Sequence, residues 1–527
     1  RGGNAADAAV ATGLALAVTY PRAGNIGGGG FAVLRLADGK ATSIDFREMA
    51  PGKATRDMYL DAEGNVVPGR STTGHLASGI PGTVAGLHLL YEKYGSHKLT
   101  WAQLVEPSRR LAENGFRVTQ ALAADMQAGT RSLGRHAESK RIFLRDGRPY
   151  ETGEIFKQPD LAATLERIER DGVAGFYAGK TAQLIADEMA RNAGLITLDD
   201  LAAYRAVERP VMRGSYRGHE IITMAPPSSG GVALLQMLGM LEPHDVSALG
   251  FNSAAKIHLF TEVMRRAFRD RAEYLGDPDF VHVPVEPLLE PSYLTRSMSS
   301  FDPSQATPST ALRPADLPPP ESSETTHFSV VDSQGNAISV TYTLNGLWGN
   351  GVTVTGGGFL LNNEMDDFTS KVGVRNGYGL LQGESNAIAP HKRPLSSMTP
   401  TIVLKDGQPF LVTGSPGGPT IINTVLLVIT NVIDFHMSVT QAVDAPRFHH
   451  QWQPDAINHE PFFTSPDTVA ILEKQGHKLT TRKLYPNAPE AEARTWGDAE
   501  SILIDPMTKR LQGASDVRSP DSAAVGW

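Results

Sequence analysis

The clearest alternation of apolar and polar positions lies just past the middle of the chain. Phe328–Val331 and Ala337–Tyr342 are two runs of β-forming residues, and a polar turn, Asp332–Asn336, separates them. Two β-rich runs around a Gly/Asn turn indicate a β-hairpin. The pattern therefore predicts a hairpin that begins directly after the pair Thr325 and Thr326.

The segment in front of this hairpin has no helical or strand periodicity. Residues 301–324 contain six prolines. Proline lacks an N–H and restricts the residue before it, so we expect an irregular connector here. The paired threonines are therefore expected where a loose connector meets a rigid sheet.

Apolar periodicity elsewhere predicts a chain of mixed α and β structure. A second hairpin is expected around Asp38-Gly39, and residues 75–300 are expected to be mostly helical. The main helices are expected at Asn4–Val18, Ser253–Tyr274, Thr420–Ile433 and Pro466–Gln475. On Ser253–Tyr274 we expect the arginines Arg265, Arg266, Arg269 and Arg271 to form a solvated or salt-bridged face.

The glycine run Gly27–Gly30 does not indicate a phosphate site. Neither GxxxxGK[ST] nor a clear GxGxxG context surrounds it. We expect close backbone approach between a sheet and a helix at these glycines.

Composition narrows the class of protein. The chain has 527 residues, 41% hydrophobic and 20% charged, with a net charge of −8. This balance is ordinary for a globular protein and argues against nucleic-acid binding. The absence of cysteine excludes disulfides and thiolate chemistry. The apolar run Thr424–Phe435 is shorter than the roughly 20 residues of a bilayer span, so we expect a core helix there and no membrane span.

Thr325 has a chemical interpretation as well as a structural one. A threonine pair is usually two β-formers opening a strand. A threonine hydroxyl becomes a useful nucleophile when a base stands beside it, and an N-terminal threonine carries its own α-amine. In an uncut chain that amine is part of the Glu324–Thr325 peptide bond. The catalytic interpretation therefore requires autocleavage between Glu324 and Thr325, and spacing alone leaves both interpretations open.

The stretch Thr325–Asn345 resembles the start of the small subunit of the γ-glutamyltranspeptidases. The similarity extends over nearly the whole chain, through Gly2–Ala8, Phe46–Pro51, Leu360–Phe368, Lys392–Met398, Thr413–Gly418 and Ala445–Trp452. It implies the α+β fold of the N-terminal nucleophile hydrolases, a four-layer αββα sandwich. It also implies a large subunit (1–324, ending in the connector 301–324) and a small one (325–527) that together form one intertwined unit.

The resemblance assigns roles to residues that match the family's motifs. Thr325 would be the nucleophile and Thr343 its hydrogen-bond partner, with Gly417 and Gly418 as the oxyanion hole. Arg47, Ser396 and Ser397 would hold the substrate α-carboxylate. Glu364 and Asp367 would hold the α-ammonium, and Asn345 would contact the substrate. Residues 371–390 match a lid loop, in which Tyr378 would be the gate.

The residue types suit these roles. A guanidinium fork matches a planar carboxylate, and an α-amino acid head group needs a cationic and an anionic partner set apart. Glu364 and Asp367 could instead be a metal pair or an acid/base pair, but no histidine stands at ligand spacing. We expect His449 and His450 to be structural.

One loop departs from the family's pattern. Gly346–Asn350 stands where many members have Thr-X-Phe-Gly-Ser. Because this loop is expected to border the site, we expect the change to bear on acceptor preference.

The function implied by the resemblance is the cleavage of γ-glutamyl compounds such as glutathione. The glutamyl group would pass to an amino acid, a peptide or water, with no metal or cofactor. Export to the periplasm or the outside is also implied, and the chain begins so abruptly that we expect its natural N-terminus further upstream. Three alternatives stay open: a cephalosporin acylase, a poly-γ-glutamate depolymerase, and an inactive binding homologue, which would have lost Thr325 or the head-group residues.

Overall fold

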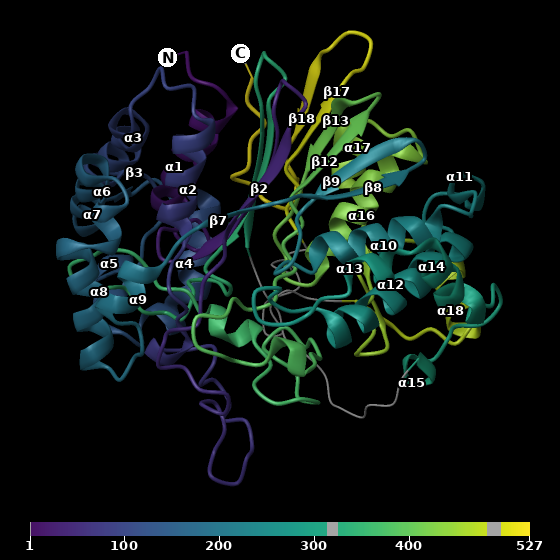
Figure 1. Cartoon of the computed structure of the whole chain (residues 1–527), viewed down its shortest axis with the longest axis horizontal. Coiled ribbons are helices and arrows are strands. Elements are labelled where there is room, and N and C mark those ends of the chain that lie inside the picture. The colour runs from purple at the N-terminus through teal and green to yellow at the C-terminus, as the bar shows by residue number, and fades with distance from the viewer. Residues whose placement is uncertain (1, 313–324, 482–496, 527) are drawn as a thin grey trace. The chain divides into compact units, whose positions relative to one another are not determined.

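The computed structural model describes residues 2–312, 325–481 and 497–526, and these fold into two compact units (Figure 1). The first unit comprises Arg1–Pro210, Ser323–Ser370 and Ile388–Pro394. The second comprises Val211–Ser322, Lys371–Ala387 and Leu395–Trp527. Each unit therefore contains chain from both sides of the Glu324–Thr325 bond.

An antiparallel five-stranded sheet forms the centre of the first unit. Its order is β10 (Thr326–Val331), β11 (Ala337–Thr343), β1 (Gly29–Arg35), β2 (Ala41–Phe46) and β7 (Val207–Arg209). Both predicted hairpins are confirmed, because β10 pairs with β11 and β1 pairs with β2. The long-range pairing of β1 with β11 joins the two hairpins into one sheet.

Helices pack against this sheet. Asn4 caps α1 (Ala5–Thr19) through a capping box with Asp7, which confirms the predicted first helix. α1 contacts β10 and β11, and α2 (Thr83–Tyr94) contacts β1 and β2. The other helices of the unit are α3 (Trp101–Asn114), α4 (Gln120–Leu133), α5 (Ala137–Phe143), α6 (Pro159–Asp171), α7 (Ala174–Tyr177), α8 (Gly179–Arg191) and α9 (Leu198–Ala203).

The glycine run allows close backbone approach, as predicted, although its closest neighbours are not helical. A Cβ on Gly28 would lie 1.9 Å from the Thr343 carbonyl oxygen, and one on Gly27 would lie 2.0 Å from that of Leu360. The nearest neighbours of the run are thus strands and a loop of the same sheet layer.

A six-stranded antiparallel sheet forms the centre of the second unit. Its order is β18 (Leu511–Ala514), β17 (Ser501–Ile504), β13 (Gln408–Thr413), β12 (Thr401–Lys405), β9 (His219–Thr223) and β8 (Met212–Tyr216). A smaller sheet contains β14 (Phe448–His449), β15 (Ile457–His459) and β16 (Leu479–Thr481).

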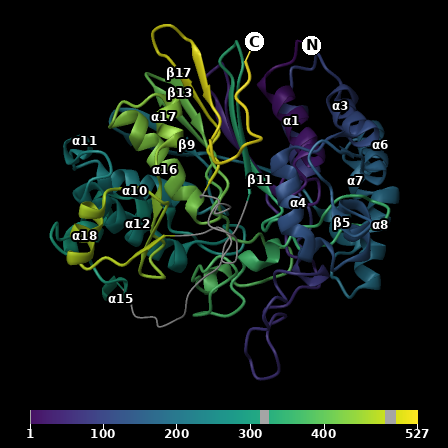
Figure 2. The same ribbon diagram turned by 180° about the vertical axis from the view of Figure 1, so that it is seen from behind.

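Figure 2 shows α16 (Thr420–Ile433) of the second unit in the view from behind. Every residue of α16 is buried, so the apolar run is a core helix as predicted. Within the described residues, no helix is both long and apolar enough to span a bilayer. The remaining helices include α10 (Gly230–Leu241), α11 (Val246–Leu249), α12 (Ala254–Tyr274), α13 (Val285–Leu289), α14 (Pro291–Ser297), α17 (Val439–Asp444) and α18 (Pro466–Lys474).

The arginines of α12 distinguish the two alternatives. Arg265, Arg266 and Arg271 are buried, and Arg265, Arg266 and Arg269 form ion pairs, so the face is salt-bridged rather than solvated. Arg265 pairs with Asp455, and Arg266 pairs with Glu262 at 2.5 Å. A buried guanidinium needs hydrogen-bond acceptors, and most of the acceptors here belong to residues distant in the sequence.

The connector expectation needs a small correction. The described part contains a short helix, α15 (Ser309–Leu312), where the sequence predicts irregular chain. Residues 313–324, including Glu324, lie outside the described residues.

Candidate active site

Four positions of the first unit's sheet form one row across four strands. In the β10–β11 register Thr326 pairs with Tyr342, so one further step places Thr325 opposite Thr343. Thr343 pairs with Gly29 of β1, and the β1–β2 register extended by one residue places Gly29 opposite Arg47. Residues directly opposite each other in an antiparallel sheet point to the same face. Thr325 and Arg47 therefore lie on one face of the sheet, with a side-chain-free glycine in the row between them.

The Thr325 end of the row is enclosed. Thr325 is 5% exposed and immediately precedes β10. The Thr343 hydroxyl accepts a hydrogen bond from the Asn345 N–H at 2.8 Å. Asn345 lies beyond the end of β11 with φ 75°, so the alternation of side chains along β11 does not continue to it. The Asn345 amide instead donates to the Asn363 carbonyl at 2.9 Å.

At the other end of the row, Arg47 meets both predicted ammonium-binding residues. Its Nη1 donates to Glu364 and its Nη2 donates to Asp367, both on the 3-10 turn η3 (Glu364–Asp367). Its Nε donates to the Pro394 carbonyl at 3.1 Å. A cationic and an anionic group set apart were expected, whereas here the two are paired directly. A substrate head group would therefore have to insert between them.

The backbone of Arg47 is fixed from several sides. Its N–H donates to Asp45 at 2.9 Å, and its carbonyl accepts from the Tyr204 hydroxyl at 2.9 Å. The Asp45 carboxylate also pairs with Arg209 at 2.8 Å and with Arg393 at 3.4 Å. Such support holds a binding side chain in one geometry.

Sequence analysis missed Glu48, which is fully buried beside Arg47. Its Oε2 lies 3.8 Å from Arg47 Nη1. Burial raises the pKa of Glu48 and that of Glu364, while Arg47 acts against this rise. A second charged residue directly after a buried strand was the available signal, since a carboxylate in such a place needs a partner or a proton.

The second unit contains the remaining predicted site residues. The Ser397 hydroxyl accepts from Arg271 at 3.2 Å, and the Ser396 carbonyl accepts from the Ser229 N–H at 2.8 Å. The Ser228 hydroxyl donates to the Met398 carbonyl at 2.6 Å. The 225–231 loop thus holds the serine pair in place, a role that no pattern in the sequence indicated.

Gly417 and Gly418 lie directly before α16, both with positive φ (128° and 54°). The Gly417 carbonyl accepts from the Thr420 hydroxyl at 2.8 Å, which fixes the turn. Neither glycine N–H has an acceptor within the described ranges. Free amides at a helix N-terminus are suited to stabilising an oxyanion.

Tyr378 is 8% exposed and belongs to the hydrophobic core of the second unit. The carbonyls of Tyr378 and Gly379 accept from the Gln451 amide at 3.4 and 3.3 Å. Its role as a gate stays a prediction.

The departing loop uses its tryptophan for packing. Trp348 is 2% exposed and its ring lies 5.3 Å from that of Phe143. Asn350 donates to the Gly74 carbonyl and to the Ser78 hydroxyl. These two substitutions therefore serve the core of the first unit, and an influence on acceptor choice stays a prediction for the half-buried Gly346 and Leu347.

The two neighbouring histidines make the contacts of structural groups. His449 is bonded to Asn423 at 2.6 Å and to Gln451 at 2.8 Å. His450 lies 3.2 Å from Asp455, and burial lowers its pKa to about 4.

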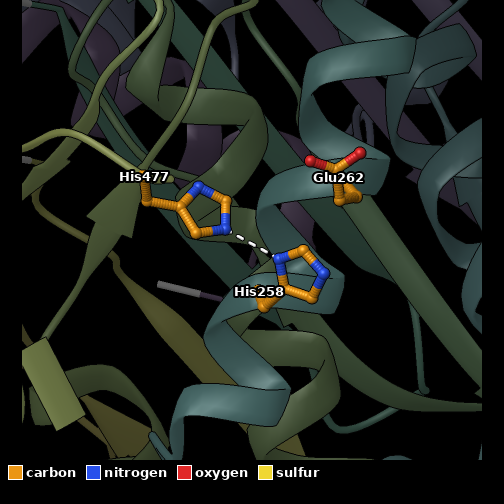
Figure 3. A group of neighbouring side chains, drawn as sticks. All are labelled: His258, Glu262 and His477. Atoms are coloured by element: carbon orange, nitrogen blue, oxygen red, sulfur yellow. Dashed lines mark hydrogen bonds between the residues drawn. The ribbon is translucent and has the colours of Figure 1, made fainter. Parts of the chain in front are cut away.

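One group of side chains has the composition of a metal site: His258, Glu262 and His477 (Figure 3). The Asp302 carbonyl can only accept a hydrogen bond, so His258 Nε2 carries the hydrogen of that bond. His258 Nδ1 then accepts from His477 Nε2 at 2.7 Å. The Glu262 carboxylate forms ion pairs with Arg266 and with Arg265, the latter at 3.4 Å. It also accepts a hydrogen bond from the Thr307 N–H. Two guanidinium groups beside the carboxylate oppose a cation, so we interpret the group as a hydrogen-bonded part of the core.

Comparison with known proteins identifies the family. A family model described as gamma-glutamyltranspeptidase matches residues 1–526. The glutathione hydrolase proenzyme of Escherichia coli (strain K12) is 50% identical over 527 residues, covering 100% of this chain and 88% of the relative.

Two solved structures extend the comparison to the fold. Cephalosporin acylase from Bacillus halodurans superposes with a TM-score of 0.85 at 27% identity, covering 98% of this chain and 90% of that one. The γ-glutamyltranspeptidase of Helicobacter pylori has a TM-score of 0.58 at 47% identity, covering 59% and 89%. The protein thus has the αββα fold of the N-terminal nucleophile hydrolases. Within that class, the chain belongs to the γ-glutamyltranspeptidase family.

Proposed function

We propose that this protein is a γ-glutamyl acyltransferase and hydrolase that first cuts its own chain before Thr325. The cut releases the Thr325 α-amine beside the Thr325 hydroxyl, which supplies the missing base. The substrate is glutathione or a related γ-glutamyl compound, as the name of the Escherichia coli relative supports.

The row from Thr325 to Arg47 is the observation that carries this proposal. Three strand spacings separate the two positions, or about 14 Å. The side chain of Arg47 and a bound glutamyl group would together extend across the distance between the Arg47 and Thr325 positions. The α-carboxylate would then lie at Arg47 and the γ-carbonyl at Thr325, while Glu364 and Asp367 would take the α-ammonium.

The reaction has two steps. Thr325 Oγ attacks the γ-carbonyl carbon while the Thr325 amine accepts the hydroxyl proton, and the amide N–H groups of Gly417 and Gly418 stabilise the oxyanion. The C–N bond of the substrate amide then breaks. The amine released from the substrate takes up that proton and leaves, and a γ-glutamyl ester remains on Thr325. An amino acid, a peptide or water attacks this ester and restores the hydroxyl.

The head-group residues favour this function over its rivals. A cephalosporin acylase has no need of Arg47, Glu364 and Asp367 buried together. An inactive homologue would have no reason to retain both Thr325 and this cluster. A poly-γ-glutamate depolymerase shares the glutamyl head and is the second candidate, because the cluster fits the end of such a polymer equally well.

The remaining parts of the proposal follow from the family. We include export to the periplasm or the outside, and transfer of the glutamyl group to an amino acid, a peptide or water. The large (1–324) and small (325–527) subunits remain together after the cut, because each compact unit contains chain from both.

Intact mass measurement with N-terminal sequencing tests the central step. Wild-type protein should give two fragments, the smaller beginning at Thr325, and should release glutamate from glutathione. Thr325→Ala should stay whole and inactive, and Thr325→Ser should cut and turn over more slowly, because serine keeps the hydroxyl. An uncut wild-type chain, or an active Thr325→Ala variant, would overturn the proposal.

A further inference from the structure

Glu48 has no role in the function proposed above, although it touches the centre of the site. It is 0% exposed, and neither of its carboxylate oxygens accepts a hydrogen bond from an N–H or hydroxyl group of another described residue. Glu364 Oε2 is in the same state, while Glu364 Oε1 accepts from Arg47. With Asp367 on Nη2, three carboxylates therefore face one guanidinium.

Their charges cannot all be present at once. Three ionised carboxylates and one guanidinium would leave two uncompensated negative charges in a buried site. Buried carboxylates without a partner take up a proton instead. Glu48 and Glu364 lie at the same nitrogen, because Glu48 Oε2 is 3.8 Å from Arg47 Nη1 and Glu364 Oε1 accepts from that Nη1. Two carboxyl groups can hydrogen-bond only when one of them is protonated.

Among the described residues, Arg47 is the cation that lies beside the Glu48 carboxylate. The charged and titratable groups that act on Glu48 include Arg47 at the end of β2, Glu364 and Asp367 on η3, Tyr177 of α7 and Tyr204 after α9. Burial raises the pKa of both tyrosines, so they stay neutral. Gly29 and Gly79 close the remaining sides, since a Cβ on either would lie within 3 Å of the Glu48 side chain.

We propose that Glu48 and Glu364 share one proton in the resting enzyme, and that Glu48 thereby acts as a positioning residue for Arg47. The shared proton leaves fewer negative charges for a substrate α-carboxylate to displace from the guanidinium. This inference rests on the proposed function, in which Arg47 receives that carboxylate.

Loss of the shared proton should weaken substrate binding. As the pH rises, the pair ionises and a further negative charge faces Arg47 Nη1. This charge holds the guanidinium and repels an incoming carboxylate, so KM should rise while kcat changes little. Glu48→Gln keeps the shape of the protonated acid but cannot ionise, so its KM should lack this rise.

The test compares KM and kcat for glutathione hydrolysis between about pH 7 and about pH 10 in processed wild type and Glu48→Gln. Titration of the Thr325 amine and of the substrate ammonium is common to both proteins and cancels in their ratio. We expect the wild-type KM to rise at least about fivefold more than that of the variant. Glu188→Gln, which removes a buried glutamate paired with His75, should follow the wild type.

Equal KM profiles in wild type and Glu48→Gln would overturn the inference and leave the proposed function intact. Failure of the wild type to cut itself or to release glutamate would instead overturn the proposed function. The two failures are therefore distinguishable.

Infrared spectroscopy gives a readout that does not depend on the folding of the Glu48 variant. Protein labelled with ¹³C-glutamate should show a protonated carboxyl band at neutral pH that disappears on alkaline titration. The Glu500→Gln background is needed, because burial also raises the pKa of Glu500 to about 9. Absence of the band at neutral pH in that background would overturn the shared proton.

Discussion

Arg47 donates from Nη2 to the carboxylate of Asp367, a residue 320 positions later in the chain. The Arg47 side chain is fully buried and that of Asp367 is 12% exposed. One partner lies before the Glu324–Thr325 bond and the other after it. After self-cleavage this ion pair would join the two subunits at the proposed substrate site.

Arg47→Lys should separate charge from geometry. A lysine ammonium keeps the positive charge but cannot serve Glu364 and Asp367 through two fixed N–H groups, nor bind a carboxylate bidentately. We expect kcat/KM for glutathione to fall about 100-fold, equivalent to about 2.7 kcal/mol. Arg141→Lys, at a half-exposed site paired with Glu138 and Asp160, should leave it unchanged. A fall of less than about threefold in Arg47→Lys would contradict the assigned role.

Lys256→Met should stabilise the protein. Lys256 is fully buried, and burial lowers its pKa from 10.5 to about 7. Its Nζ is bonded to Asn252 at 3.1 Å and lies near the rings of Phe251 (4.8 Å), Phe260 (5.0 Å), Phe435 (5.1 Å) and Phe448 (5.8 Å). The rings recover part of the cost of burying the charge. Methionine fills the same space without it, and we expect a gain of about 1–3 kcal/mol near pH 7.

The pH dependence of this gain gives the sharper test. Between pH 7 and 10.5 the unfolded chain binds more protons at this position than the folded one, so the stability of the parent rises with pH. The advantage of Lys256→Met should therefore shrink from neutral to alkaline pH. Thermal midpoints of both proteins in the uncut Thr325→Ala background would show it. An advantage that grows with pH would refute the lowered pKa.

The sequence predicted the sheet around Thr325 because its signals are local. Alternation and turn residues define the hairpins β10–β11 and β1–β2, and pairing β1 with β11 then creates the row from Thr325 to Arg47. The roles of Ser396, Ser397 and the glycine pair came from resemblance, and their placement in the second unit has no local signal in the sequence.

Long-range charge pairing was beyond the reach of periodicity. The arginines of α12 look like a solvated face until Asp455 and Ser309, far away in sequence, are placed beside Arg265. In the same way, nothing in the sequence distinguishes Glu48 from the other polar residues of its motif, and only the structure shows that it is buried. In the sequence Trp348 is one residue of the loop that departs from the family's pattern. In the structure it has a left-handed backbone and packs in the core against neighbours such as Gly129.

The end of the connector's described part should remain attached after self-cleavage. The Ser309 N–H donates to Asp455 at 2.7 Å, and the Thr307 N–H donates to Glu262 at 3.0 Å. Hydrogen exchange of the cut protein should therefore find both amides protected. Asp455→Asn weakens the acceptor for Ser309 and the partner of Arg265, and it should speed exchange at Ser309 about tenfold. Thr307 serves as the internal control, and equal exchange at Ser309 in variant and wild type would contradict the contact.

Gly28→Ala should impair self-cleavage by displacing Thr343. A Cβ at this position would lie 1.9 Å from the Thr343 carbonyl oxygen, so β1 and β11 would have to move apart. Overpacking of this kind costs about 3 kcal/mol, and here it also shifts the partner of the nucleophile. Gly39→Ala is the matched control: φ is +94° but no atom lies within 4 Å of the new methyl group, so it should cost about 1 kcal/mol and leave cutting unchanged. The measurements are the thermal midpoint and the time course of fragment appearance. Wild-type cutting by Gly28→Ala would show that the alignment of Thr343 with Thr325 does not control the cleavage step.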